Sequence, residues 1–189
     1  MNLRQRLLKS LYPMVMKSSS KGENGRIIKN PSATVPLKSF YALKGVKGNG
    51  EELDFSVFKN KKVLIVNTAS NCGYTGQYAS LQELFEKEKD KLVILGFPSN
   101  EFQGQEKADD KAIAEFCQVN FGVTFPLMKK SIVLKKKDQN EVYNWLSNAS
   151  QNGWNTQVPV WNFSKYLIDE TGNLQGYFGP AVEPQDVLV

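Results

Sequence analysis

Short apolar runs alternate with amphipathic stretches along the middle of this chain of 189 residues. Val63–Val66 and Leu92–Phe97 are apolar runs rich in branched side chains, which are typical of buried β-strands. Apolar residues recur at three- and four-residue spacing in Tyr78–Lys89 and in Asp109–Val119, which predicts two amphipathic helices. This alternation of strand and helix predicts an α/β fold in which helices flank a central sheet.

Turn residues divide the rest of the pattern into shorter elements. A glycine-rich segment, Gly45–Gly50, separates two short stretches and predicts an N-terminal β-hairpin. Near the other end of the chain, Glu170–Gly172 separates Tyr166–Asp169 from Leu174–Phe178 and predicts a closing hairpin. The other predicted elements are the hairpin strands Phe40–Leu43 and Glu52–Phe55, a short strand at Ser131–Leu134 and a helix at Glu141–Leu146. Together these elements predict one domain with a mixed sheet.

We interpret residues 1–35 as a basic arm and linker, and residues 36–189 as the folded domain. Four leucines of the arm fall on one helical face beside basic residues: Leu3, Leu7, Leu8 and Leu11. Lys9 and Pro13 interrupt this apolar stretch, which is too short for a membrane span and is followed by no cleavage signature of a signal peptide. We favour a loosely ordered arm, with an amphipathic helix on a membrane surface as the alternative.

The formal net charge is +5 and the pI is near 9.1, values that a nucleic-acid-binding protein would also show. However, the lysines are scattered over expected turns and no aromatic residues are interleaved with them, so we favour a solvated basic surface and no nucleic acid partner. The chain has no histidine. This excludes a Cys-His or Ser-His-Asp mechanism and any histidine-ligated metal site.

The chain has two cysteines, Cys72 and Cys117, which are far apart in the sequence and do not form a CxxC pair. Cys72 lies just after the predicted strand Val63–Val66, where a small-residue turn leads into the next helix. A helix N-terminus favours an anion and lowers the pKa of a nearby thiol, so Cys72 is a candidate reactive thiolate. From its placement alone, an inert cysteine that fills space under the turn is an equal alternative.

Four motifs carry a resemblance to a known family: Asn67–Gly73 (NTASNCG), Gly96–Glu106 (GFPSNEFQGQE), Phe121–Pro126 (FGVTFP) and Trp161–Asp169 (WNFSKYLID). In this order and at about this spacing they resemble the glutathione peroxidase family, from roughly Ser39 to Pro184. The resemblance implies a thioredoxin-like fold and a peroxidase without a cofactor, which reduces hydrogen peroxide and organic or lipid hydroperoxides in the response to oxidative stress.

The same resemblance implies the residues of the site. Cys72 takes the position of the peroxidatic nucleophile, and Gln105, Trp161 and Asn162 take the positions of the residues around it. Gln and Asn amides and the Trp indole donate hydrogen bonds without carrying charge, so they stabilise a thiolate without a histidine. Taken singly, Trp161 would be a core aromatic residue, Asn162 a turn residue and Gln105 an exposed loop residue.

Cys117 lies in a segment, EFCQVNFGVTFP, that resembles the one carrying the resolving cysteine in the thioredoxin-dependent branch of the family. A sulfenic acid at Cys72 would condense with Cys117 to a disulfide, which thioredoxin would reduce. From the sequence spacing alone, a buried structural thiol is the favoured interpretation of Cys117. The alternative functions are a glutathione-dependent peroxidase and a redox sensor that passes oxidation to a partner protein.

Two departures from the family are visible. The nucleophile is cysteine where other members have selenocysteine, and Ser99 stands where many relatives have a further cysteine. The segment between Pro126 and Trp161 is short, so it lacks the insertion that some relatives use for tetramer contacts. We therefore expect a monomer or weak dimer. The cysteine usage fits a reducing compartment, which makes the cytoplasm the expected location, with a membrane-surface association as the alternative.

Overall fold

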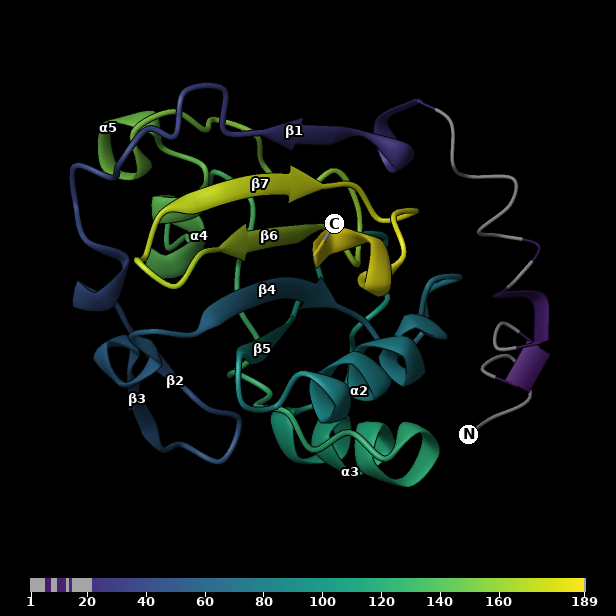
Figure 1. Cartoon of the computed structure of the whole chain (residues 1–189). Helices are drawn as coiled ribbons and strands as arrows, with labels where there is room; N and C mark the ends of the chain where they lie inside the picture. The colour runs from purple at the N-terminus through teal and green to yellow at the C-terminus, as the bar shows by residue number, and fades with distance from the viewer. Residues whose placement is uncertain (1–5, 8–9, 13, 15–21, 189) are drawn as a thin grey trace.

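β4 (Lys62–Thr68) is the strand around which the main sheet is built. The computed structural model describes residues 6–7, 10–12, 14 and 22–188. In the described chain the main sheet has five strands in the order β1-β7-β6-β4-β5, as Figure 1 shows. The other four are β1 (Ile27–Lys29), β5 (Leu92–Pro98), β6 (Lys165–Ile168) and β7 (Leu174–Phe178). β4 pairs parallel with β5 and antiparallel with β6, so the predicted mixed sheet is confirmed.

Successive side chains of β4 enter two different cores, because a strand buried on both sides alternates its side chains between the two faces of the sheet. Leu64 and Val66 pack on one face, under α2 (Gln77–Lys87) and α3 (Asp110–Phe121). Val63 and Ile65 pack on the other face, with α4 (Glu141–Leu146), which contacts the short α5 (Ala149–Asn152). Figure 1 shows α2 and α3 side by side below β4.

Local signals in the sequence fix the ends of these helices. The Asp109 side chain accepts a hydrogen bond from Ala112 N at 2.9 Å and begins α3, and Gly122 ends it in the left-handed region at φ 66°. Asn140 begins α4 in the same way, with a bond from Val142 N at 3.0 Å. Four 3-10 helices complete the described chain: η1 (Gly22–Gly25), η2 (Phe40–Ala42), η3 (Phe55–Phe58) and η4 (Pro184–Leu188).

The predicted hairpins are confirmed, with one shifted strand. β2 (Lys44–Val46) pairs antiparallel with β3 (Glu52–Asp54), whereas Phe40–Leu43, predicted as the first strand, forms η2 and its cap. The residues of η2 and η3 bury their rings against α4, and the centroids of Phe40 and Trp145 are 5.4 Å apart.

The predicted strand at Ser131–Leu134 is wrong, because this segment is a loop. Its backbone donors are satisfied outside any sheet: the carboxylate of Glu101 accepts from Val133 N and from Leu134 N. Ser131 N donates to the carbonyl of Pro98 at 2.9 Å. An apolar run of this length becomes a strand only where a neighbouring strand is free to pair with it.

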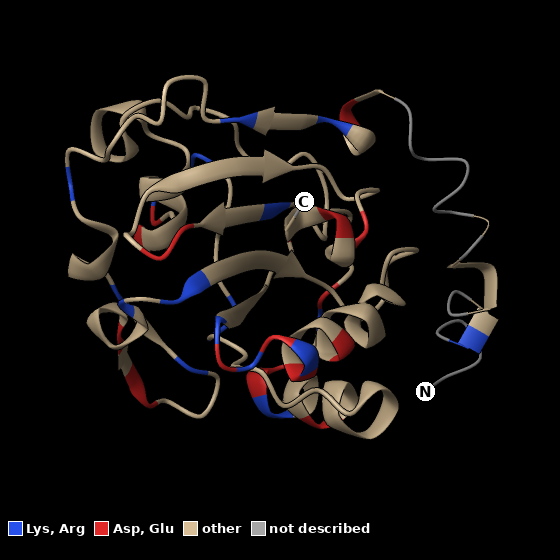
Figure 2. Cartoon of the chain, viewed as in Figure 1, with Lys and Arg blue, Asp and Glu red and all other residues tan. Residues whose placement is uncertain are grey.

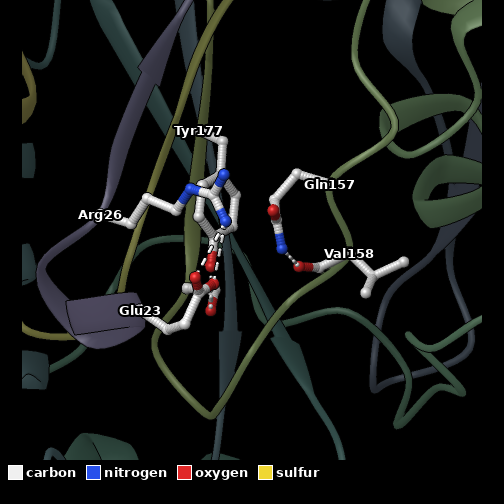
Figure 3. A network of polar contacts seen from close by, with 6 residues as sticks. Glu23, Arg26, Gln157, Val158 and Tyr177 are labelled. Carbon is white, nitrogen blue, oxygen red and sulfur yellow. Dashed lines mark hydrogen bonds and ion pairs between the residues drawn. The ribbon is translucent and has the colours of Figure 1, made fainter.

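β1 precedes the domain boundary expected from the sequence, and it pairs antiparallel with β7 at the edge of the sheet. Arg26 O accepts from Gly179 N at 2.7 Å beside this pairing. Figure 3 shows the ion pair of Arg26 and Glu23 beside the ring of Tyr177, with Gln157 bonded to the carbonyl of Val158 close by. The boundary between residues 35 and 36 stays a prediction, but the segment from residue 22 onward is fixed to the sheet.

The predicted helical face of the arm lies partly outside the described residues, since Leu3 and Leu8 are not among them. Of the described leucines, Leu7 is 57% exposed and Leu11 is 39% exposed. No helix within the described part of the chain combines the length and the apolar character needed to cross a bilayer. Figure 2 shows basic and acidic residues interspersed over separate elements.

Removing residues 1–35 is expected to destabilise the domain more than removing residues 1–21. The longer deletion takes away β1 and exposes the backbone of β7, and each lost hydrogen bond costs about 1 kcal/mol net. For a chain of this size we expect the melting temperature to fall by several degrees, at about 2–4 °C per kcal/mol. Calorimetry of both variants measures the difference. Equal melting temperatures would place the boundary at residue 36.

Candidate active site

Cys72 lies in the turn between β4 and α2, and only 1% of the residue is exposed. The side chain of Thr75 links two backbone groups of this turn. Thr75 Oγ1 accepts from Cys72 N at 3.0 Å and donates to Ala69 O at 2.9 Å. Tyr74 N donates to the sulfur at 3.4 Å, so one backbone amide of the turn is directed at the thiol. The residue types Thr and Gly and the small side chains around Cys72 allow the chain to reverse within this short segment.

The pKa of the Cys72 thiol is raised above its ordinary value, and burial is the main cause. Four hydrogen-bond donors act in the opposite direction: the backbone amides of Tyr74 and Gly73 and the side chains of Asn162 and Trp161. The expectation that the helix terminus lowers this pKa is therefore wrong in its direction. α2 begins only at Gln77, so the thiol does not sit at the helix end and loses the benefit of the dipole.

Trp161 and Asn162 reach Cys72 from a turn that precedes β6. Phe163 in this turn adopts φ 67°, an unusual conformation for an aromatic residue, and its amide donates to Asn67 O at 2.6 Å. Asn67 Nδ2 donates to Trp161 O at 3.0 Å, and Ser164 Oγ donates to the same carbonyl at 3.0 Å. The last residues of β4 therefore fix both the thiol and the donors around it.

Gln105 joins the site through Asn162 rather than through a described contact with the sulfur. Asn162 Nδ2 donates to Gln105 Oε1 at 2.9 Å, and Asn71 N donates to Gln105 O at 3.2 Å. The loop reaches this position through two residues in the left-handed region, Gln103 at φ 53° and Gly104 at φ 61°. The structure thus brings Cys72, Gln105, Trp161 and Asn162 together, as the sequence predicted. Asn162 connects Gln105 with the thiol.

Cys117 is fully buried in the middle of α3. It belongs to the same apolar core as Cys72, and neither cysteine is bonded in a disulfide. The pKa of the Cys117 thiol is raised to about 12, chiefly by burial; the hydrogen bond with Tyr78 acts to lower it, and the charge of Glu106 acts to raise it. The two thiols therefore share one core but differ in their environment, since Cys72 faces several donors and Cys117 faces few.

Sequence reasoning missed the residues that hold the site in place. Asn67 and Thr75 organise the two turns, and the amide of Tyr74 faces the sulfur. Asn67 is the first residue of the motif Asn67–Gly73 and Thr75 follows it by two positions, so both were visible as polar residues at the recognised segment. Glu106 was visible only as part of a motif, yet it is a fully buried carboxylate.

A cavity of about 660 Å³ lies between α3 and the turn of the β2–β3 hairpin. Its lining contains none of Cys72, Gln105, Trp161 and Asn162, so the Cys72 thiol does not open into it. Within the described residues, no three Cys, Asp or Glu side chains gather as they would around a metal ion.

Comparisons with known proteins agree with this geometry. A family model described as glutathione peroxidase matches residues 40–147. The chain is 45% identical over 146 residues to a glutathione peroxidase-like peroxiredoxin, GPX5, of Chlamydomonas reinhardtii, covering 77% of this chain and 89% of that protein. The crystal structure of Trgpx in its apo form matches with TM-score 0.63 and 35% identity, over 80% of this chain and 91% of that one.

A more distant solved structure, a DsbF homologue from Corynebacterium diphtheriae, matches with TM-score 0.62 over 89% of this chain and 93% of that one. Its sequence identity of 17% supports a shared fold alone. Together with the mixed sheet and its flanking helices, these neighbours show that the fold is thioredoxin-like.

Asn162→Ala is expected to raise the pKa of the Cys72 thiol further, because the thiolate loses a donor that offsets its burial. At pH 8 the alkylation of Cys72 by iodoacetamide should slow roughly three- to tenfold, as expected for one net hydrogen bond. The rate is measured in the Cys117→Ser background, so that only one thiol reacts.

Ser99→Ala is the matched control, since Ser99 is fully buried and its hydroxyl has no hydrogen-bond partner among the described residues. This variant should alkylate at the parent rate. An Asn162→Ala variant with the parent rate as well would mean that Asn162 does not stabilise the thiolate.

Proposed function

This chain belongs to the glutathione peroxidase family and is a thiol peroxidase, and on that premise we propose that Cys72 is the residue that attacks the peroxide and that thioredoxin restores it. The observation that carries the proposal is the environment of Cys72: a nearly buried thiol with neutral donors from Tyr74, Trp161 and Asn162 directed at it. The substrates are hydrogen peroxide and organic hydroperoxides, including those of lipids.

In the first step the Cys72 thiolate attacks one oxygen of the peroxide and the O–O bond breaks. The sulfur becomes a sulfenic acid, and the departing oxygen takes a proton and leaves as water or an alcohol. The donors around the sulfur stabilise the negative charge that starts on sulfur and moves to the leaving oxygen. A donor directed at developing charge in a dry site commonly contributes a few kcal/mol to the rate.

In the second step the Cys117 sulfur attacks the Cys72 sulfenic acid, a disulfide forms and water leaves. The location of both cysteines in one apolar core supports a disulfide between Cys72 and Cys117. Cys117 lies within α3, and a disulfide requires Cα atoms within about 7 Å of each other. We propose that α3 opens locally around Cys117 during each cycle and closes again on reduction.

The third step is thiol–disulfide exchange, in which a thioredoxin dithiol reduces the Cys72–Cys117 bond and is itself oxidised. Two unbonded cysteines in the described structure fit a reducing compartment, and we propose that the protein works in the cytoplasm as a monomer or weak dimer. Glutathione as the reductant is the competing outcome of the tests below.

Cys72→Ser is expected to abolish peroxidase turnover while the fold stays intact, because the hydroxyl is close in size to the thiol but is a far weaker nucleophile. Turnover is followed as NADPH oxidation with thioredoxin and its reductase, and folding by the melting temperature. Appreciable residual turnover in a folded variant would mean that Cys72 is not the nucleophile.

Cys117→Ser is expected to keep the first, stoichiometric oxidation of Cys72 and to lose thioredoxin-supported turnover. Without a second thiol, Cys72 stays as a sulfenic acid and is prone to over-oxidation, which mass spectrometry detects. The coupled assay is run in parallel with thioredoxin and its reductase and with glutathione and its reductase. Full turnover of this variant with either reductant would show that the reductant attacks Cys72 directly.

A further inference from the structure

The net charge of this chain comes entirely from residues 1–22, which we call the basic segment. The segment contains no aspartate or glutamate and five basic residues: Arg4, Arg6, Lys9, Lys17 and Lys21. Of the 24 basic residues of the chain, 19 therefore lie outside the segment, and they match the 19 acidic residues there in number. The formal charge of +5 thus belongs to the basic segment, while the rest of the chain is neutral, so an anionic partner is attracted to this one place.

Three apolar side chains of the basic segment are exposed at helical spacing. Leu7 is 57% exposed, Leu11 is 39% exposed and Met14 is 69% exposed, and the backbone is helical at all three residues. Intervals of four and three residues place them on one face of a helix. Single exposed apolar residues are ordinary on a protein surface, whereas an apolar face of this kind indicates a surface that contacts a partner.

Tyr12 fixes this segment to the folded domain from another side of the helix. Its hydroxyl donates to both carboxylate oxygens of Glu183, at 3.0 and 2.9 Å. Burial and the charge of Glu183 raise the pKa of Tyr12 well above its ordinary value, so the hydroxyl keeps its proton and remains a donor. The ring lies so close to Gly76 that a Cβ at that position would meet ring carbons at 2.6 and 2.9 Å. Gly76 is therefore required for this contact.

The contact with Tyr12 lies next to the turn that carries Cys72. Gly76 precedes α2 and follows Cys72 by four positions, and Tyr12 packs against the apolar core to which Cys72 belongs. Figure 1 shows the described residues of the basic segment at the edge of the fold, on the side where α2 begins. The exposed apolar face is thus attached to the domain beside the candidate active site.

An anionic lipid surface matches both properties of the basic segment. A nucleic acid would satisfy the positive charge but would leave the apolar face exposed, and an apolar groove of another protein would leave five cations without partners. An amphipathic helix on a membrane buries its apolar side chains about 5–10 Å deep at the boundary between head groups and acyl chains. Its lysines and arginines then interact with anionic head groups.

We propose that the basic segment binds an anionic lipid surface through Leu7, Leu11 and Met14, and that Tyr12 holds the Cys72 turn beside that surface. The binding itself goes beyond the proposed peroxidase cycle and does not depend on it. Combined with that cycle, it selects the hydroperoxides of membrane lipids as the substrate class, because they reach the protein on the side where the Cys72 turn lies.

The test is vesicle sedimentation of the full chain with a free N-terminus and without peroxide. The vesicles contain phosphatidylcholine mixed with phosphatidylglycerol, or phosphatidylcholine alone. The wild type should bind the anionic vesicles and dissociate as the salt concentration rises, because salt screens the charges. Leu7→Glu should weaken binding at least roughly tenfold, since a buried leucine is lost. Arg6→Gln should weaken it about fivefold, as expected for one basic residue at an anionic surface.

Leu37→Glu is the matched control. It changes the charge as Leu7→Glu does, and Leu37 is 79% exposed but lies outside the basic segment. This variant should bind anionic vesicles like the wild type, and both variants should keep the wild-type melting temperature because neither residue lies in the core. An equal loss of binding in both variants would show that only net charge matters and would overturn the role of the apolar face. A wild type that does not sediment with anionic vesicles at low salt would overturn the proposal as a whole.

A second measurement connects the binding with the reaction. Turnover is compared for phosphatidylcholine hydroperoxide in anionic vesicles and for hydrogen peroxide in solution. The ratio of the two rates should fall in Leu7→Glu in parallel with vesicle binding and should stay at the wild-type value in Leu37→Glu. An unchanged ratio in Leu7→Glu would overturn the selection of membrane lipids. A chain that binds vesicles but reduces neither peroxide would refute the peroxidase cycle alone, whereas an active peroxidase that binds no vesicles would refute the lipid surface alone.

Discussion

The proposed mechanism depends on two opposing requirements: the Cys72 sulfur is almost fully buried, yet as the proposed nucleophile it has to carry a negative charge. Burial alone raises the pKa of the thiol, and a chain without histidine has no imidazolium to lower it. The compensation comes from neutral donors, the Tyr74 amide and the Asn162 and Trp161 side chains. Neutral donors stabilise the thiolate through hydrogen bonds and need no opposite charge. They remain in place when the charge moves from sulfur to the leaving oxygen.

Those donors are only useful if they are held in place, and the end of β4 does this. Asn67 bonds the carbonyl of Trp161 and accepts from the amide of Phe163, so the strand that leads into the Cys72 turn also anchors the opposite wall of the site. Phe163 is in the left-handed region, which costs about 1–3 kcal/mol for a residue of this kind. Lys165 also holds this turn: its buried Nζ donates to Phe163 O at 2.8 Å, and burial lowers its pKa to about 7. The strained turn at Phe163 and the buried Lys165 thus lie together beside Trp161 and Asn162.

The sequence predicted the elements whose signal is local. β4 and β5 are apolar runs, α4 has its Asn140 cap, and the closing hairpin has its turn residues, so each was located within a few residues. It failed where partners lie far along the chain. Ser131–Leu134 had the composition of a strand, but the Glu101 carboxylate takes its amides, and β1 was missed because its pairing with β7 is invisible from so short a run. The candidate site residues were proposed from their motifs, whereas the raised pKa of Cys72 depends on burial that only the folded chain creates.

The contrast between the two thiols explains the order of events in the proposed cycle. Cys72 has donors directed at its sulfur in the folded state, so it is ready to react before anything moves. Cys117 is buried within α3 with a pKa raised to about 12, so the folded state keeps it as an unreactive thiol. A second thiol with equal reactivity would compete for peroxide and be oxidised on its own. In the proposed cycle Cys117 reacts only after α3 opens locally, so oxidation would begin at Cys72 and reach Cys117 afterwards.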